Sequence, residues 1–223
     1  MKKGIFRLAI VLFAGIMVFG SCTKKGEEDP GISFHSRTAR LAGEWKLTAQ
    51  DLTYTRTYKD QVWNEETYEY DEVMVTRTEK TTYDGTLVTE TTTWSDGRDS
   101  ETYSYAYSED FTIEKAGTYE MTSVYTGDGV ATSVDKGNWM WLNKNKEQDL
   151  AKKEALMFAS TSSTYTSSEG ASSSTSSGKS NVDGMRVIKR LANKELIFLI
   201  DYTYTNNEGE TSKRTGTITY TQD

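Results

Sequence analysis

The residue types that most often carry chemistry are scarce in this chain of 223 residues, since Cys22 is its only cysteine and His35 its only histidine. Nucleophilic catalysis by a Ser–His or Cys–His pair needs a base beside the nucleophile. Zinc and copper sites take several histidine or cysteine ligands. We therefore expect no catalytic residue, no metal site and no cofactor, and we expect that the protein is not an enzyme.

Carboxylates are the remaining candidates for chemistry. Glu65/Glu66 and Asp71/Glu72 are adjacent pairs, and neighbours on a strand point to opposite faces, which indicates solvated charges. The segment DGRDSE, residues 96–101, could recruit calcium but lacks the ligand spacing of a calcium loop, so a hairpin turn is predicted there. Two carboxylates converging in a cleft, as in glycosidases, would revive an enzymatic interpretation.

The beginning of the chain has the pattern of an export signal. Lys2, Lys3 and Arg7 precede the uncharged run LAIVLFAGIMVFG, and the small residue Ser21 stands directly before Cys22. This order is typical of a secretory signal peptide. The alternative is an uncleaved anchor helix with an incidental cysteine, although the run is shorter than the roughly 20 residues that span a bilayer.

The segment Phe19-Gly20-Ser21-Cys22 resembles a bacterial lipobox, with Phe19 where an aliphatic residue is usual. The resemblance implies that residues 1–21 are removed and that Cys22 carries the lipid, such as palmitate, that holds the protein to a membrane. Residues 22–36 are polar and charged, as in a flexible tether. Their Lys-Lys then Glu-Glu-Asp order resembles the export signal of Bacteroidetes-type lipoproteins. This implies the outer membrane, with the domain on its periplasmic or cell-surface face.

The charge of the chain limits its partners. Loss of the signal, with three basic residues, would move the net charge from -7 to -10. Such a surface repels phosphate backbones, so we expect no nucleic acid partner.

Residues 37–223 are predicted to form one all-β domain with very little helix. Thr, Tyr, Val and Trp dominate, as in pleated half-buried surfaces, and Tyr103, Tyr105 and Tyr107 alternate on one face. A bulge is expected near Asp71. Turn signals place strands near 43–58, 62–82, 86–94, 101–107, 110–114, 118–125, 130–142, 154–162, 185–192, 195–205 and 211–222.

Short strands in series without a βαβ rhythm favour an antiparallel barrel or sandwich. Stretches such as TRTEKTTYDGTLVTETTTW offer no apolar outward band, which disfavours a membrane-spanning barrel. Residues 160–180 are so rich in Ser and Thr that a disordered loop is predicted, either inert or a glycosylated or adhesive tip.

The stretch RLAGEWKLTAQ, residues 40–50, places Trp45 at the start of a strand just after Gly43, with Leu47 and Ala49 expected on the same side. This Gly-x-Trp pattern resembles the first conserved block of lipocalins, although Lys46 stands where they carry tyrosine. The segments FTIEKAGTYEM (111–121), KGNWMWLN (136–143) and RVIKRLANKELIFLI (186–200) look like lipocalin-like lipoproteins of Bacteroidetes.

The resemblance implies an antiparallel up-and-down β-barrel of about 8–10 strands, plugged at one end by Gly43 and Trp45. It also implies an arginine stacked over Trp45, for which Arg214 is the candidate and Arg186 and Arg190 are rivals. The residues expected to point inward and contact a ligand are Leu47, Phe111, Ile113, Tyr119, Met121, Trp139, Trp141 and Phe198.

A barrel of this size holds either packed side chains or one small ligand. We expect an envelope-anchored lipoprotein that is a monomer, contacts the membrane through the lipid on Cys22 and binds a small apolar molecule. The alternative is a cell-surface interaction module whose surplus tyrosines and tryptophans, such as Trp63, bind glycans or another envelope protein. A filled interior would favour the second function.

Overall fold

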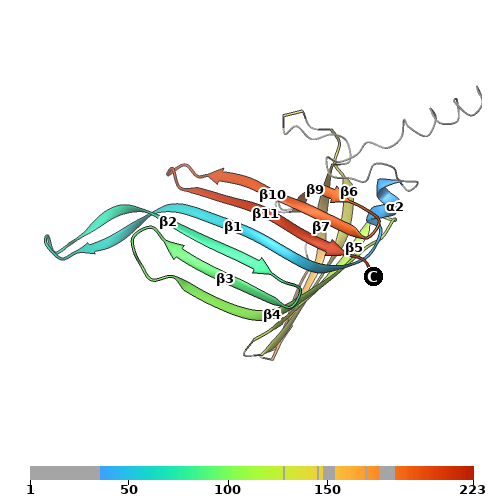
Figure 1. Ribbon diagram of the computed structural model, residues 1–223, viewed down its shortest axis with the longest axis horizontal. Helices are drawn as coiled ribbons and strands as arrows, with labels where there is room; N and C mark the ends of the chain where they lie inside the picture. Colours follow the sequence, from blue (N-terminus) through green and yellow to red (C-terminus); the bar gives the residue numbers. More distant parts are fainter. Residues whose placement is uncertain (1–35, 128, 145, 148–153, 169, 176–183) are drawn as a thin grey trace, which may run out of the picture.

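The computed structural model describes residues 36–127, 129–144, 146–147, 154–168, 170–175 and 184–223 (Figure 1). The signal, Cys22, His35 and nearly all of the tether lie outside the described residues. Among the described residues, one short helix, α2 (Arg37–Leu41), precedes the strands. These are β1 (Gly43–Asn64), β2 (Glu69–Tyr83), β3 (Leu87–Trp94), β4 (Glu101–Ile113), β5 (Thr118–Thr126), β6 (Val130–Trp141), β7 (Ala155–Ser167), β8 (Gly170–Thr175), β9 (Met185–Leu191), β10 (Glu195–Thr205) and β11 (Thr211–Thr221).

The strands close into an antiparallel barrel, which confirms the predicted fold class. Their order is β6-β5-β4-β3-β2-β1-β11-β10-β9-β7-β8, and further pairings of β6 with β7 and of β4 with β1 complete the ring. Strand β8 lies outside the ring, on the edge of β7. A closed antiparallel barrel with ten strands in its ring is compatible with a lipocalin-like fold.

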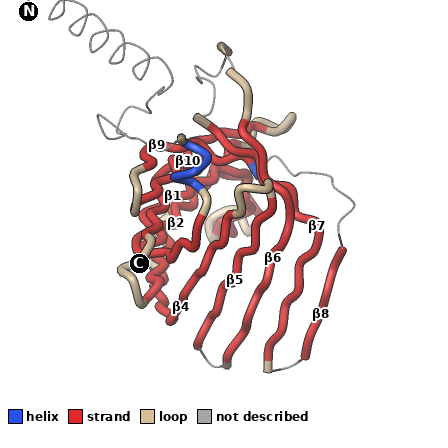
Figure 2. The backbone as a smooth tube through the Cα atoms, turned by 90° about the vertical axis from the view of Figure 1, so that its right-hand side faces the viewer, coloured by secondary structure: helices blue, strands red, loops and turns tan. Residues whose placement is uncertain are grey.

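The ring is narrower at one end than at the other. Gly43–Lys46 of β1 pair directly with residues 110–113 of β4, so eight strands close the ring there. From Gln50 onward β1 pairs with β2 instead, and the hairpin of β2 and β3 separates β1 from β4. Beyond this narrow end the strands diverge in two directions (Figures 1 and 2). We call the side of the sheet that is continuous with the ring interior the inward face.

A register shift in β1 changes which residues point inward. Leu47 faces Tyr220 of β11 and Ala49 faces Thr219, with the irregularity between Leu47 and Ala49. Trp45 and Leu47 are buried, whereas Ala49 is exposed, so the prediction that Ala49 shares their side was wrong. Because of this bulge, even-numbered residues of β1 point inward after it, and Leu52 is buried.

The hairpin of β1 and β2 is longer than the sequence indicated. Its turn lies between Asn64 and Glu69, and pairing runs without a break from Gln50↔Tyr83 to Asn64↔Glu69. The predicted bulge near Asp71 was therefore wrong. Both faces of the hairpin over residues 59–74 are largely exposed. The alternation of residue types there therefore does not indicate which face is buried.

Two other strand boundaries differ from the prediction. Residues 101–107 and 110–114 were expected as separate strands but form the single strand β4. The Ser/Thr-rich segment was expected as a loop, yet β7 continues to Ser167 and β8 covers Gly170–Thr175. The edges of β6 and β7 offer these residues backbone hydrogen-bond partners, and threonine suits a strand. Residues 176–180 lie outside the described part of the chain.

The core occupies the narrow end of the ring, where α2 covers it. Ser36 caps this helix by accepting a hydrogen bond from the backbone of Ala39. The buried cluster comprises Leu41, Trp45, Leu47, Tyr83, Val88, Phe111, Ile113, Tyr119, Trp139, Leu156, Ile188, Leu191, Leu196, Phe198 and Tyr220.

Candidate functional site

The expected plug residue, Trp45, lies fully buried at the narrow end, with 0% of its surface exposed. Its indole Nε1 donates a hydrogen bond of 2.8 Å to the carbonyl of Leu41 at the end of α2, and its backbone faces Phe111 across the β1–β4 pairing. Gly43 adopts φ +152°, and a Cβ there would meet the side chain of Gln222. The hydrogen bond from Trp45 to Leu41 joins the first strand to the end of the helix.

The expected arginine partner of Trp45 lies elsewhere. Arg214 is opposite Tyr54 of β1, nine residues along the strand from Trp45, and it is exposed. The buried arginines at the narrow end come instead from α2. The guanidinium carbon of Arg37 lies 5.9 Å from the centre of the Trp141 ring, and Arg40 Nη1 donates to the carbonyl of Leu191.

The residues expected to contact a ligand form the packed core. Ring centres are 5.9 Å apart for Phe111 and Tyr119, and 5.2 Å apart for Tyr119 and Phe158. Those of Phe198 and Tyr220 are 6.0 Å apart. Leu47, Ile113 and Trp139 are buried in the same cluster, and Met121 and Trp141 pack against it partly buried. Spacings of this size are those of contacting aromatic rings, so these side chains contact one another.

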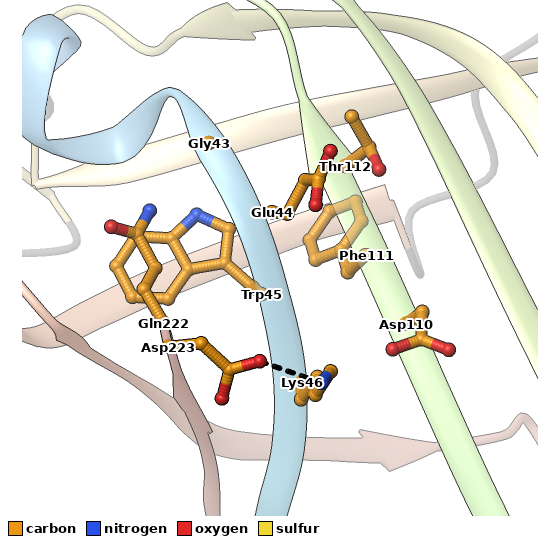
Figure 3. A pocket seen from close by; sticks show the side chains of 9 residues that line it. All are labelled: Gly43, Glu44, Trp45, Lys46, Asp110, Phe111, Thr112, Gln222 and Asp223. Atoms are coloured by element: carbon orange, nitrogen blue, oxygen red, sulfur yellow. Dashed lines mark hydrogen bonds and ion pairs between the residues drawn. The ribbon is translucent and has the colours of Figure 1, made fainter.

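A pocket of about 410 Å³ lies where β1 meets β4 (Figure 3). The exposed Glu44, Lys46 and Asp110 line it together with Asp223. Lys46 Nζ donates a hydrogen bond of 2.7 Å to Asp223 Oδ2, which raises the pKa of Lys46 and lowers that of Asp223. The exposed charged residues of β1 and β4 alternate with the buried Trp45 and Phe111, so the pocket opens on the outer surface of the ring.

A carboxylate held by hydroxyl groups lies on the inward face next to the core. Glu109 Oε2 accepts hydrogen bonds from Tyr107 Oη at 2.6 Å and from Ser123 Oγ at 3.2 Å. Its Oε1 accepts one from Tyr220 Oη. Burial, and then the charge of Glu109, raise the pKa of Tyr107 and of Tyr220 above the ordinary tyrosine value.

A second carboxylate, Asp135, has a similar environment. It accepts a hydrogen bond of 3.0 Å from Tyr119 Oη and another from Ser160 Oγ. Burial, and then Asp135, raise the pKa of Tyr119, while the positive charge of Arg186 opposes this rise. Arg186 also opposes the rise in the pKa of Tyr220. Its positive charge therefore acts on Tyr119, which binds Asp135, and on Tyr220, which binds Glu109.

Beyond Glu109, a row of tyrosines continues along the inward face. Ring centres are 4.9 Å apart for Tyr107 and Tyr125, 6.1 Å for Tyr125 and Tyr105, and 6.4 Å for Tyr105 and Tyr103. Glu90 of β3 accepts hydrogen bonds from Tyr105 Oη at 3.0 Å and from Tyr103 Oη. We call these four tyrosines and Glu90 the tyrosine face.

The tyrosine face passes from buried to exposed. Tyr107 and Tyr105 are half-buried, whereas Tyr103 is 54% exposed. The hydrogen bond to Glu90, and then burial, raise the pKa of Tyr103, and burial followed by Glu90 raises that of Tyr105. The hydroxyl groups of Tyr103 and Tyr105 stay protonated at neutral pH and donate their hydrogen bonds to Glu90.

The sequence indicated only part of this arrangement. The alternation of Tyr103, Tyr105 and Tyr107 was visible and placed them on one side. Glu109 continues the same alternation but was not singled out, and Glu90 and Asp135 were missed because their tyrosine partners come from other strands. An acidic residue in phase with inward tyrosines is the signal that could have identified Glu109.

The other acidic candidates are placed separately. Glu65, Glu66, Asp71 and Glu72 lie near the end of the β1–β2 hairpin and are exposed. In the predicted turn at 96–101, Arg98 Nε donates a hydrogen bond of 2.6 Å to Asp96 and its Nη2 binds Asp60. Arg98 thus joins Asp96 of this turn to Asp60 of β1. Among the described residues, no cluster of three or more potential metal ligands is found.

Comparison with protein-family models, curated proteins and solved structures finds no significant match to this chain. Within the described residues, no helix has both the length and the apolar character needed to cross a membrane. Function is therefore inferred from the arrangement of the chain's own side chains.

Proposed function

We propose that this chain is a lipocalin-like lipoprotein of the Bacteroidetes type, anchored to the outer membrane through Cys22, that binds a glycan on the tyrosine face. The observation that supports glycan binding is that Glu90 holds the hydroxyl groups of Tyr103 and Tyr105 beside partly exposed rings. The protein acts in this proposal as a non-catalytic interaction module of the cell envelope.

The chemistry of the tyrosine face suits a neutral, hydroxyl-rich molecule. A tyrosine ring offers an apolar surface for the C–H groups of a sugar, and the oxygen of a hydroxyl group that donates to a carboxylate can still accept a hydrogen bond. A carboxylate such as Glu90 accepts stronger hydrogen bonds from hydroxyl groups than a neutral acceptor does. The negative net charge, -7 for the whole sequence and -10 after loss of the signal, disfavours anionic ligands such as phosphorylated molecules.

A small apolar molecule, the ligand that the lipocalin resemblance implied, is the less favoured alternative. Phe111, Tyr119 and Phe198, which were expected to contact it, are buried in contact with other aromatic rings. A ligand placed among them would have to displace packed side chains, which is unfavourable in a dense core. The tyrosine face needs no such rearrangement.

The test is isothermal titration of the full chain in non-ionic detergent with a panel of neutral gluco-, xylo- and manno-oligosaccharides. We expect at least one to bind, and we expect Tyr103→Ala and Glu90→Gln each to weaken that binding by roughly tenfold. Tyr70→Ala, on the far hairpin, is the matched control and should bind normally. Absence of sugar binding, together with an apolar molecule retained in native mass spectrometry, would favour the alternative.

A further inference from the structure

The end of the β1–β2 hairpin extends beyond the rest of the sheet. Pairing of β1 with β11 ends at Thr57↔Thr211, and pairing of β2 with β3 ends at Arg77↔Trp94. Residues 58–76 therefore continue as a two-stranded ribbon without a third strand, at the far left of Figure 1. A ribbon of this kind is only marginally stable by itself, so its length calls for a reason other than the core.

Three aromatic side chains gather at the end of this ribbon. Trp63 and Tyr70 are directly opposite each other, with ring centres 5.2 Å apart, and the ring of Tyr68 lies 6.3 Å from that of Trp63. Their exposed fractions are 47%, 64% and 77% for Trp63, Tyr70 and Tyr68. We call these three residues the aromatic tip. Exposed apolar groups gathered in one place indicate a contact surface.

The turn that carries the tip holds an unfavourable backbone conformation. Tyr68 adopts φ 56°, and it is the non-glycine residue with positive φ among the described residues. Glycine or asparagine is usual in this region, and a bulky residue there is strained. The side chain of Asn64 holds the turn by accepting hydrogen bonds from the backbone of Glu66 and Thr67. A large aromatic ring is thus kept at a position that would more readily take glycine.

The surroundings of the aromatic tip are acidic. Residues 60–72 include six acidic residues and no basic residue. Asp60 and Glu72 are engaged by Arg98 and Lys59, while Glu65, Glu66 and Glu69 are exposed beside the tip. This charge is complementary to lysine and arginine, and it is repelled by anionic lipid headgroups. Aromatic rings also attract such cations.

We propose that the aromatic tip, together with Glu65, Glu66 and Glu69, docks onto a partner protein whose surface presents lysine or arginine beside apolar side chains. Trp63 and the two tyrosines supply the buried centre of the contact, and the carboxylates form its charged rim. The tip projects from the opposite end of the hairpin to the narrow end of the ring. Docking is independent of the proposed glycan binding, because none of its residues belongs to the tyrosine face.

The probe is a short fluorescent peptide of alternating lysine and leucine, titrated onto the full chain in non-ionic detergent. We expect saturable binding that weakens with salt, as electrostatic contacts do. Trp63→Ala and the combined change Glu65→Gln, Glu66→Gln and Glu69→Gln should each weaken it by roughly tenfold. The matched control replaces three exposed acids elsewhere, by Asp51→Asn, Glu114→Gln and Asp201→Asn, and should bind as the original chain does.

Two results would overturn the proposal. The first is peptide binding that is absent, or that falls by the same factor in the control variant. In the latter case net charge alone would explain the binding. The second result is insertion of the aromatic tip into a membrane. The full chain is reconstituted in phosphatidylethanolamine vesicles that contain brominated lipid, and Trp63→Phe is compared with the original. Quenching that disappears with Trp63→Phe would place the tip in lipid, whereas equal quenching in both chains keeps it in water.

Discussion

Tyr220 of β11 donates a hydrogen bond to Glu109 of β4 over β1, the strand that pairs with both of them at the narrow end. The two residues are 111 positions apart in the chain. Tyr220 also packs against Phe111 and Phe198, with ring centres 5.8 and 6.0 Å away. Tyr220 therefore joins the aromatic core to Glu109, which also accepts a hydrogen bond from Tyr107 of the tyrosine face.

Tyr220→Phe should lower the free energy of unfolding by about 1–3 kcal/mol, because it leaves an acceptor of Glu109 without its buried donor. Urea denaturation followed by circular dichroism measures the change. Tyr204→Phe is the matched control, since Tyr204 lies on the neighbouring strand β10 and is exposed, and its loss of stability should be small. Equal effects of both changes would contradict a special role for the bond to Glu109.

Stability should fall at alkaline pH. In the folded protein the pKa of Tyr105, Tyr107, Tyr119 and Tyr220 is raised, first by burial and then by neighbouring carboxylates. The folded state thus holds these protons more tightly than the unfolded state. Their contribution is fully present below the unfolded pKa of 10.0 and is lost as the pH rises through the folded values. Unfolding free energies measured from pH 8 upward, in steps through about pH 11, test this.

Tyr220→Phe also provides the control for the alkaline loss of stability. The variant lacks one of the groups with raised pKa, so its stability should depend less steeply on pH above about 10. A variant with the same slope as the original chain would show that Tyr220 does not contribute to the effect.

Trp45→Ala should cost about 3–5 kcal/mol of stability, because it removes a fully buried ring and leaves a cavity at the narrow end. Trp45→Phe should cost less, since it keeps part of the volume and loses the hydrogen bond to Leu41. Trp63→Ala removes an exposed ring and should change stability by less than about 1 kcal/mol. Thermal unfolding of the three variants measures the order, and a large effect of Trp63→Ala would contradict it.

Gly137→Ala should destabilise the pairing of β6 with β7 by about 1–3 kcal/mol. A Cβ at Gly137 would lie 2.1 Å from the carbonyl oxygen of Ala159 and 2.8 Å from the ring of Tyr119, so the backbone would have to move. Gly127→Ala is the matched control, because a Cβ there meets nothing within 4 Å. Comparable urea midpoints for the two variants would contradict the close approach at Gly137.

The strand content of this protein could be predicted because local residue types determine it. Threonine and aromatic residues favour strands, and turn signals such as Asp84-Gly85 mark strand ends, so most strands and the burial of Trp45 were predicted correctly. The end of the β1–β2 hairpin and residues 160–175 were placed wrongly. The hairpin end is largely exposed, and residues 160–175 are almost all small or polar by sequence. The hydrophobic pattern that normally fixes a turn or a register is therefore absent.

The carboxylate partners of the tyrosines could not be predicted, since they depend on the register between paired strands and, for Tyr220 and Glu109, on which two strands lie beside β1. Nothing near Arg214 in sequence shows that it pairs opposite Tyr54 instead of reaching Trp45, and nothing near Glu109 points to Tyr220. The amino-acid sequence alone determined an all-β chain with an aromatic core, because both follow from local alternation and side-chain size. The tertiary structure decided the narrow end of the ring, the tyrosine face and the projecting tip, because closure of the barrel sets the register between distant strands.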